Sequence, residues 1–171
     1  MSTSSRTNHT KAVAISAAFI AISMIFSYIE AILPSIGIPG VKLGLANIII
    51  IVVMYKMDMR YAIVINVARI LLSSLMFSGI FAMLYSLAGA FVSMAIMFLL
   101  KKSGKFSIIG VSFAGGVAHN FGQVLVAAFV IENARIFVYF PVLVFSGLIS
   151  GIIIGIIAYI LVKRLPDKMF R

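Results

Sequence analysis

Arg69 interrupts one long apolar stretch of the sequence, and His119, Asn120 and Gln123 interrupt another. An arginine at the centre of a membrane-spanning helix costs roughly 2.5 to 3.5 kcal/mol on insertion scales, so such residues persist where they line a polar interior or a ligand site. A guanidinium matches the oxygens of a carboxylate or phosphate, and side-chain amides can support the same group. These residues therefore predict a site for an anionic ligand.

The composition indicates that the elements carrying these residues are membrane helices. Hydrophobic residues make up 63% of the 171 residues and charged residues 11%, and the mean hydropathy is +1.22, which is far from the composition of soluble domains. We expect an all-α integral membrane bundle of six transmembrane helices, each near the roughly 17 to 25 residues that a span needs. The apolar stretches that predict them are 11–33, 41–55, 61–78, 81–100, 106–131 and 136–162.

The basic residues predict how this bundle is oriented. Six spans place both chain ends and the loops 56–60 and 101–105 on one side, with eleven of the fourteen Lys and Arg residues. Because basic residues accumulate in cytoplasmic segments, we expect a multi-pass protein of the cell membrane with a cytoplasmic segment at 1–10, one membrane domain at 11–165 and a cytoplasmic tail at 166–171. This accounts for the net charge of +10, so nucleic-acid binding is not expected. A five-span alternative, suggested by the weak break at Ser78-Gly79, would divide the basic residues between the two sides.

Depth along each helix places most polar side chains between the membrane centre and the outer surface. The side chains expected to line a ligand pocket there are Glu30, Lys42, Asn47, Asn66, Arg69, His119, Asn120 and Gln123. Almost none are expected in the inner half, which favours an outward-facing pocket over a transporter with alternating access to both sides.

Several of these residues have structural alternatives. Asn47 and Asn66 could form interhelical hydrogen bonds, which contribute about 0.6 kcal/mol each, and Arg69 could be neutralised by Glu30 in an ion pair. His119 could ligate a metal or haem iron, but one histidine without a second ligand is a weak signal. We therefore expect no metal and no cofactor.

Enzymatic motifs are missing from the sequence. No G-x-x-x-x-G-K-[ST] loop is present to bind ATP, and no cysteine is available as a nucleophile or thiolate ligand. The acidic residues are Glu30, Asp58, Glu132 and Asp167. No two are close in sequence, whereas enzymes that condense prenyl diphosphates cluster aspartates to hold magnesium. The chain is not expected to be an enzyme.

Small residues recur at intervals of about four on the first and sixth expected helices, which lets helices approach closely. They are Ala14, Ala17, Ala18 and Ala21 on the first helix, and Gly147, Gly151 and Gly155 on the sixth. On the sixth helix we expect packing inside the bundle. On the first, packing and a docking surface for another membrane subunit are both compatible with the composition.

Five sequence segments together resemble a known bacterial membrane family. They are Tyr28-Ile29-Glu30 with Pro34, Pro39-Gly40-Val41-Lys42-Leu43-Gly44-Leu45-Ala46-Asn47, Arg69-Ile70-Leu71-Leu72-Ser73-Ser74, Tyr85-Ser86-Leu87-Ala88-Gly89-Ala90, and Ala118-His119-Asn120-Phe121-Gly122-Gln123 followed by Tyr139. The family is called Gx transporter or, by an older label, heptaprenyl diphosphate synthase component I. Through this resemblance Tyr139 joins the expected ligand-binding residues.

That family is similar in size and six-helix layout to the S components of energy-coupling factor (ECF) transporters, which is an analogy between folds. The resemblance implies a membrane subunit that captures a small molecule outside the cell and docks on a membrane T component coupled to two ATPase subunits. S components dock through an Ala-x-x-x-Ala patch on their first helix, which Ala14, Ala17, Ala18 and Ala21 match. The expected cargo is a small, anionic and partly apolar vitamin, cofactor, or isoprenoid or quinone precursor. The older label supplies the alternative, a non-catalytic membrane subunit associated with heptaprenyl diphosphate synthesis.

Overall fold

The computed structural model describes residues 3–33 and 43–170, and of residues 3–9 it describes the backbone alone. Throughout this part of the chain the regular structure is helical. The α-helices are α1 (Thr3–Ile32), α2 (Ala46–Lys56), α3 (Met59–Ser73), α4 (Gly79–Ser103), α5 (Ile108–Ile131) and α6 (Phe140–Arg164). A π-helical segment η1 (Ser74–Ser78) joins α3 to α4, and the 3₁₀ segments η2 (Ala134–Tyr139) and η3 (Asp167–Met169) flank α6. The expected all-α class is confirmed.

Local side-chain chemistry sets several of the helix ends. The Asp58 carboxylate accepts a hydrogen bond of 2.7 Å from the Met59 N–H at the start of α3, and Ser107 Oγ accepts one of 3.1 Å from the Gly110 N–H at the start of α5. Such caps satisfy backbone donors that a helix leaves unpaired. Gly104, with φ of 67°, ends α4 in the left-handed conformation that glycine adopts without strain.

Four stretches of described helix are long and apolar enough to cross a membrane, namely Thr10–Ile32, Met59–Ser103, Ile108–Ile131 and Ala134–Arg164. The chain is therefore a multi-pass membrane protein. The second expected span is shorter than predicted, because α2 has 11 residues and rises about 16 Å, roughly half of the ~30 Å hydrocarbon core. The third and fourth expected spans form one continuous stretch of 45 residues.

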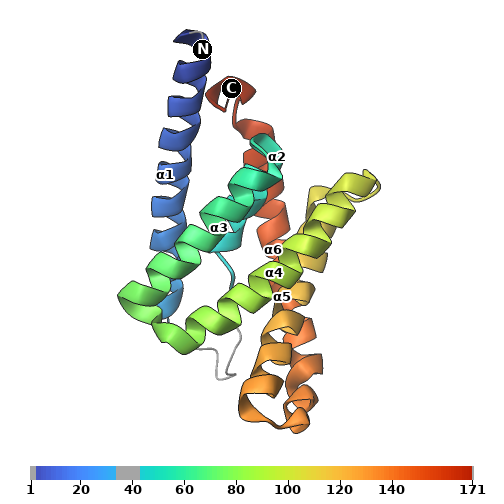
Figure 1. Ribbon diagram of the computed structural model, residues 1–171. Coiled ribbons are helices and arrows are strands. Elements are labelled where there is room, and N and C mark those ends of the chain that lie inside the picture. The colour runs from blue at the N-terminus through green and yellow to red at the C-terminus, as the bar shows by residue number, and fades with distance from the viewer. Residues whose placement is uncertain (1–2, 34–42, 171) are drawn as a thin grey trace.

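The chain reverses direction inside that continuous stretch. Figure 1 shows α3 and α4 meeting at a sharp bend, from which the two helices diverge. The bend follows the π turn of η1, and Gly79 begins α4 with φ of 82°, a value that glycine adopts without the penalty of a Cβ atom. The predicted break at Ser78-Gly79 is therefore a turn between two helices, although no polar loop marks it.

In contrast, α5 and α6 run side by side in close contact (Figure 1). A Cβ atom built on Gly151 would lie 2.9 Å from Phe113 Cα, and one built on Gly155 would lie 2.9 Å from Ile109 Cα. The backbones are thus too close for any side chain at these positions. This confirms that the small residues of the sixth helix serve packing within the bundle.

The apolar core surrounds α2. Every residue from Ile48 to Met54 is buried, so this helix has no face left for lipid, as expected of a helix that is apolar all round. Phe19 of α1, Ile65 of α3 and Met97 of α4 belong to the same cluster.

The two ends of the chain meet at one end of the bundle (Figure 1). Lys11 Nζ donates a hydrogen bond of 2.8 Å to the Lys168 carbonyl, and Lys56 forms an ion pair of 2.6 Å with Asp167. The Phe170 ring stacks on Phe19 with 6.1 Å between centroids. The C-terminal residues therefore hold the first part of α1 against the core.

We expect Gly151→Ala to destabilise the bundle. The added methyl would meet backbone atoms of α5, namely Phe113 Cα and the Ser112 carbonyl oxygen at 3.0 Å, so the helices would have to separate at a cost of about 1 to 3 kcal/mol. The unfolding temperature of the detergent-solubilised protein should fall. The matched control is Gly110→Ala, where the nearest atom would lie 3.6 Å away and no loss is expected. Equal unfolding temperatures for the two variants would contradict the close contact.

Candidate functional site

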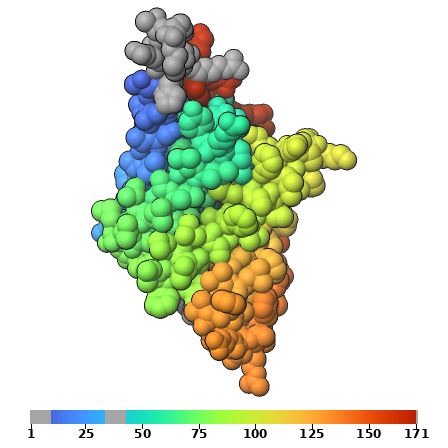
Figure 2. All heavy atoms as spheres, viewed as in Figure 1, coloured from blue at the N-terminus to red at the C-terminus, as the bar shows by residue number. Residues whose placement is uncertain are grey.

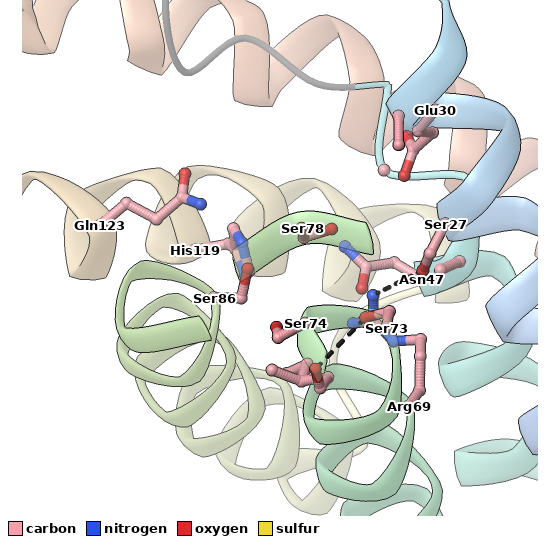
Figure 3. Close-up of a pocket in the computed structure, with 14 residues that line it drawn as sticks. Ser27, Glu30, Asn47, Arg69, Ser73, Ser74, Ser78, Ser86, His119 and Gln123 are labelled. Carbon is pink, nitrogen blue, oxygen red and sulfur yellow. Dashed lines mark hydrogen bonds between the residues drawn. The ribbon is translucent and has the colours of Figure 1, made fainter. Parts of the chain in front are cut away.

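A polar cavity of about 70 Å³ lies between α1, α2, α3, α4 and α5. Figure 3 shows its side chains arranged around a central space, with Arg69 and Ser27 on one side and His119 and Ser86 on the other. Predicted residues that line it are Glu30, Asn47, Arg69, His119 and Gln123. The sequence reasoning thus identified residues from four helices that the fold brings to one cavity.

Arg69 is the central charge of this cavity. Its Nη2 donates a hydrogen bond of 2.6 Å to Asn66 Oδ1, and its Nη1 donates one of 3.3 Å to Ser27 Oγ. The Nε atom is buried and has no hydrogen-bond partner among the described residues. A buried donor left without a partner costs about 1 to 3 kcal/mol, more when the group is charged. The side chain that lines the cavity therefore keeps one donor without a partner among the described residues.

Asn66 acts behind Arg69 and does not line the cavity. It is 3% exposed, accepts from the guanidinium, and donates from Nδ2 to Met94 Sδ at 3.2 Å. Because Asn66 and Arg69 are three residues apart on α3, they share one face of the helix. The structural alternative considered for Asn66 fits this geometry, since the amide links α3 to α4 while it orients the arginine.

Glu30 lies near Arg69 but forms no salt bridge with it. Its Oε1 accepts a hydrogen bond of 2.9 Å from the Leu45 N–H, directly before α2 begins at Ala46. A carboxylate at this place offsets the partial positive charge of a helix N-terminus. No carboxylate in the described part of the chain lies within 4.0 Å of the guanidinium. The two side chains therefore do not form a salt bridge, and their charges interact over a longer distance.

His119 separates the polar cavity from a second one. A Cβ atom built on Gly89 would lie 2.8 Å from His119 Cε1, so the imidazole packs directly on the backbone of α4. The second cavity has about 50 Å³ and shares Asn47 and His119 with the first. The glycine at position 89 is what gives the ring its space.

Asn120, Tyr139 and Lys42 were also expected to bind ligand. Asn120 Nδ2 donates to the Leu143 carbonyl at 2.5 Å and lines the second cavity, so its amide links α5 to α6. Tyr139 is 62% exposed and lies outside the lining of the polar cavity. Lys42 falls outside the described residues.

Hydroxyl groups form the part of the cavity that the sequence reasoning missed. They belong to Ser27, Ser73, Ser74, Ser78 and Ser86. Ser73 follows Arg69 by four residues and so lies on the same face of the helix, although a serine in an apolar stretch is not by itself a signal. The serine hydroxyls are neutral donors that suit an anion held beside a guanidinium.

Buried hydroxyl groups also occur in the half of the bundle that is closer in space to the chain termini. Ser23, Ser93 and Ser112 are 0%, 5% and 3% exposed, and Ser112 Oγ donates to the Gly151 carbonyl at 2.7 Å. We expected almost all of the polar side chains in the half of the bundle that contains Arg69. The structure shows that they also occur in the other half.

The fold and the cavity define a multi-pass helical membrane protein with an arginine-centred polar interior. Comparison with protein families agrees with this class and assigns the chain to one family within it. The model of the family described as heptaprenyl diphosphate synthase component I matches residues 19–161. The chain belongs to this family, as its sequence segments predicted. Neither a curated protein nor a solved structure gives a match.

We predict that Arg69→Ala weakens ligand binding without unfolding the protein. Hydrogen bonds to a charged group contribute about 1.5 to 3 kcal/mol, which corresponds to a roughly 10- to 150-fold loss of affinity. Mass spectrometry would identify the small molecule that copurifies with the detergent-extracted protein. That molecule is then titrated into the wild type and the variant, and its affinity is obtained from the rise in unfolding temperature. His119→Ala should change the affinity in the same direction.

Asn120→Ala is the matched control for these two variants. It removes the hydrogen bond to the Leu143 carbonyl, so we expect a lower unfolding temperature but an unchanged ligand affinity. Wild-type affinity in Arg69→Ala would assign the arginine a purely structural role.

Proposed function

We propose that this protein is the substrate-binding membrane subunit of an ECF-type importer. The observation that carries the proposal is the guanidinium of Arg69, which lies beside a polar cavity with its Nε buried and unpaired among the described residues. A buried cation that forms no salt bridge with a described carboxylate favours an anionic ligand group. The carboxylate or phosphate of a vitamin, a cofactor, or an isoprenoid or quinone precursor would supply it.

In the proposed topology the chain crosses the membrane six times, and both termini lie in the cytoplasm. The position of the cavity supports this topology. Glu30, near the end of α1, and Ser78, at the α3–α4 bend, both line the cavity. In Figure 1 these two places lie away from the end of the bundle where the chain termini meet. The basic residues gather at the end with the termini, which is the cytoplasmic end by the positive-inside rule. The cavity would then open toward the exterior, where an importer captures its substrate.

The first helix supports docking on a T component. Ala14, Ala17, Ala18 and Ala21 are all exposed, in contrast to the packed glycines of α6. Apolar side chains continue the surface, with Ile22 39% and Ile25 57% exposed. An exposed row of alanines lets the backbone of another helix approach closely, which is the property that a docking patch between membrane helices requires.

The second candidate is a non-catalytic membrane subunit of heptaprenyl diphosphate synthesis. The name of the matching family favours it. Among the described residues no three acidic or histidine side chains lie together, so this part of the chain offers no aspartate cluster of the kind that holds magnesium against a diphosphate. The chain would therefore assist a separate catalytic subunit.

We expect Ala14→Leu and Ala18→Leu to prevent assembly of the transporter. Each leucine would hold the partner helix away from α1, so the T component and the two ATPases should no longer copurify in the pull-down. Ala134→Leu is the control, because Ala134 is also exposed but lies in η2, away from α1. Recovery of the intact complex from either α1 variant would refute the docking surface.

Reconstitution of a prenyl diphosphate synthase with and without this chain separates the two candidate functions. Under the importer proposal, the rate of the reaction and the length of the product stay the same. A longer product or a faster rate in the presence of the chain would replace the proposal with the synthase-associated role.

A further inference from the structure

A large apolar groove runs between α3 and α4 on the outside of the bundle. It encloses about 980 Å³ and is separate from the polar cavity around Arg69. Ile63 and Val67 of α3 face Phe91, Met94 and Phe98 of α4 across it. These residues recur every three or four positions, so each helix offers one continuous apolar face to the groove.

The groove is open because the two helices diverge from the bend at Gly79 (Figure 1). Phe91 is 79% exposed, Ile63 44% and Phe98 43%. In the space-filling view, α3 and α4 both lie on the near face of the molecule (Figure 2). Within a bilayer, such a space does not hold water and must be filled by another apolar group.

Charged residues occur at one end of the groove. Asp58 and Arg60 at the start of α3 line it, and both are exposed. Lys102 is exposed as well and follows Phe98 by four residues, which places it one turn further along the same face of α4. The Asp58 carboxylate already accepts the Met59 N–H. The positive charges of Arg60 and Lys102 exceed the single negative charge of Asp58, so the net charge at this end of the groove is positive.

Lys101 adds to the positive charge but is occupied elsewhere. Its Nζ donates to the Met54 carbonyl and lies 5.0 Å from the centroid of the Tyr55 ring. Arg60 lines the groove, and Lys102 lies one turn beyond Phe98, the last groove residue of α4.

The length of the groove corresponds to one leaflet. From Met59 to Val67 the helix rises about 12 Å, and from Leu87 to Phe98 about 16 Å, whereas half of the hydrocarbon core is roughly 15 Å. The helix of a partner protein would cross both leaflets and extend beyond the groove. A lipid occupies one leaflet, with its headgroup at the interface and its chains toward the membrane centre.

We propose that this groove binds an anionic phospholipid from the leaflet nearest the chain termini. The phosphate-bearing headgroup lies between Arg60 and Lys102, and the acyl chains lie along Ile63, Val67, Phe91 and Met94. This lipid site is distinct from the cavity of the imported ligand and does not depend on the importer proposal.

The test measures lipid retention by native mass spectrometry. The full-length protein is purified in mild detergent and incubated with an equimolar mixture of phosphatidylglycerol and phosphatidylcholine. We expect at least a fivefold preference for phosphatidylglycerol. The double variant Arg60→Gln, Lys102→Gln should reduce that preference to near one, while the charge control Lys105→Gln, Arg164→Gln should keep it.

Filling the groove provides a second, independent arm. Ala95 is exposed and lines the groove, so Ala95→Phe should reduce the retention of both lipids severalfold. Leu99→Phe is the bulk control, because Leu99 is 60% exposed on the same helix but does not line the groove. The unfolding temperature in detergent reports whether each variant is folded, and Ala95→Ile replaces Ala95→Phe if the larger residue unfolds the protein.

Three results would overturn the proposal. One is equal retention of the two lipids by the wild type, and another is unchanged retention in the folded Ala95 variant. The third is displacement of phosphatidylglycerol by a polyprenyl diphosphate at equal concentration, which would assign the groove to an isoprenoid chain instead.

Discussion

The structure depends on holding one guanidinium inside an apolar bundle. Arg69 has to exchange water for protein hydrogen bonds, and the residues that provide them come from different helices, Asn66 from α3 itself and Ser27 from α1. Asn66 is in turn held by Met94 of α4. The arginine therefore links α1, α3 and α4 through polar contacts. Among the described residues its Nε has no hydrogen-bond partner, so this part of the protein leaves the charged group incompletely satisfied.

Energetic cost explains which site residues the sequence could reveal. Arg69, Glu30 and His119 were predictable, because a charged or strongly polar side chain in an apolar stretch is expensive and needs a reason. The serines gave no such signal. A serine in a membrane helix can satisfy its hydroxyl on the preceding turn, as Ser73 does with the Ile70 carbonyl at 3.2 Å, so it carries little cost. Asn120 lines only the second cavity, and the sequence could not show this, because the residue is adjacent to His119 and the α5–α6 contact decides where its amide points.

The same logic applies to the fold. Helices bounded by charged residues were located to within a few residues, for example 106–131 against the observed Ile108–Ile131. The bend between α3 and α4 was visible only as a weak break, because it is made by the backbone of Gly79 and a π turn rather than by a polar loop. The length of α2 was overestimated, since hydropathy marks where apolar residues occur and does not show where the helix starts. In the structure Leu45 lies outside the helix, with its N–H bound to Glu30.

The size of the cavity has a consequence for the proposed function. Ligand pockets usually have about 300 to 1,000 Å³, whereas this cavity has about 70 Å³, enough for an anionic group but not for a whole vitamin. Capture of a larger molecule therefore requires a boundary of the cavity to move. α1 is the boundary with the least packing, because most of its apolar residues are exposed, and at the cavity it is joined by the Ser27–Arg69 and Glu30–Leu45 hydrogen bonds. At its other end, the stacking of Phe170 on Phe19 and the Lys11–Lys168 bond hold it in place. An anion that takes over the donors of Arg69 would release Ser27, so binding itself would loosen the end of α1 that must move, while the half that carries the exposed alanines stays fixed.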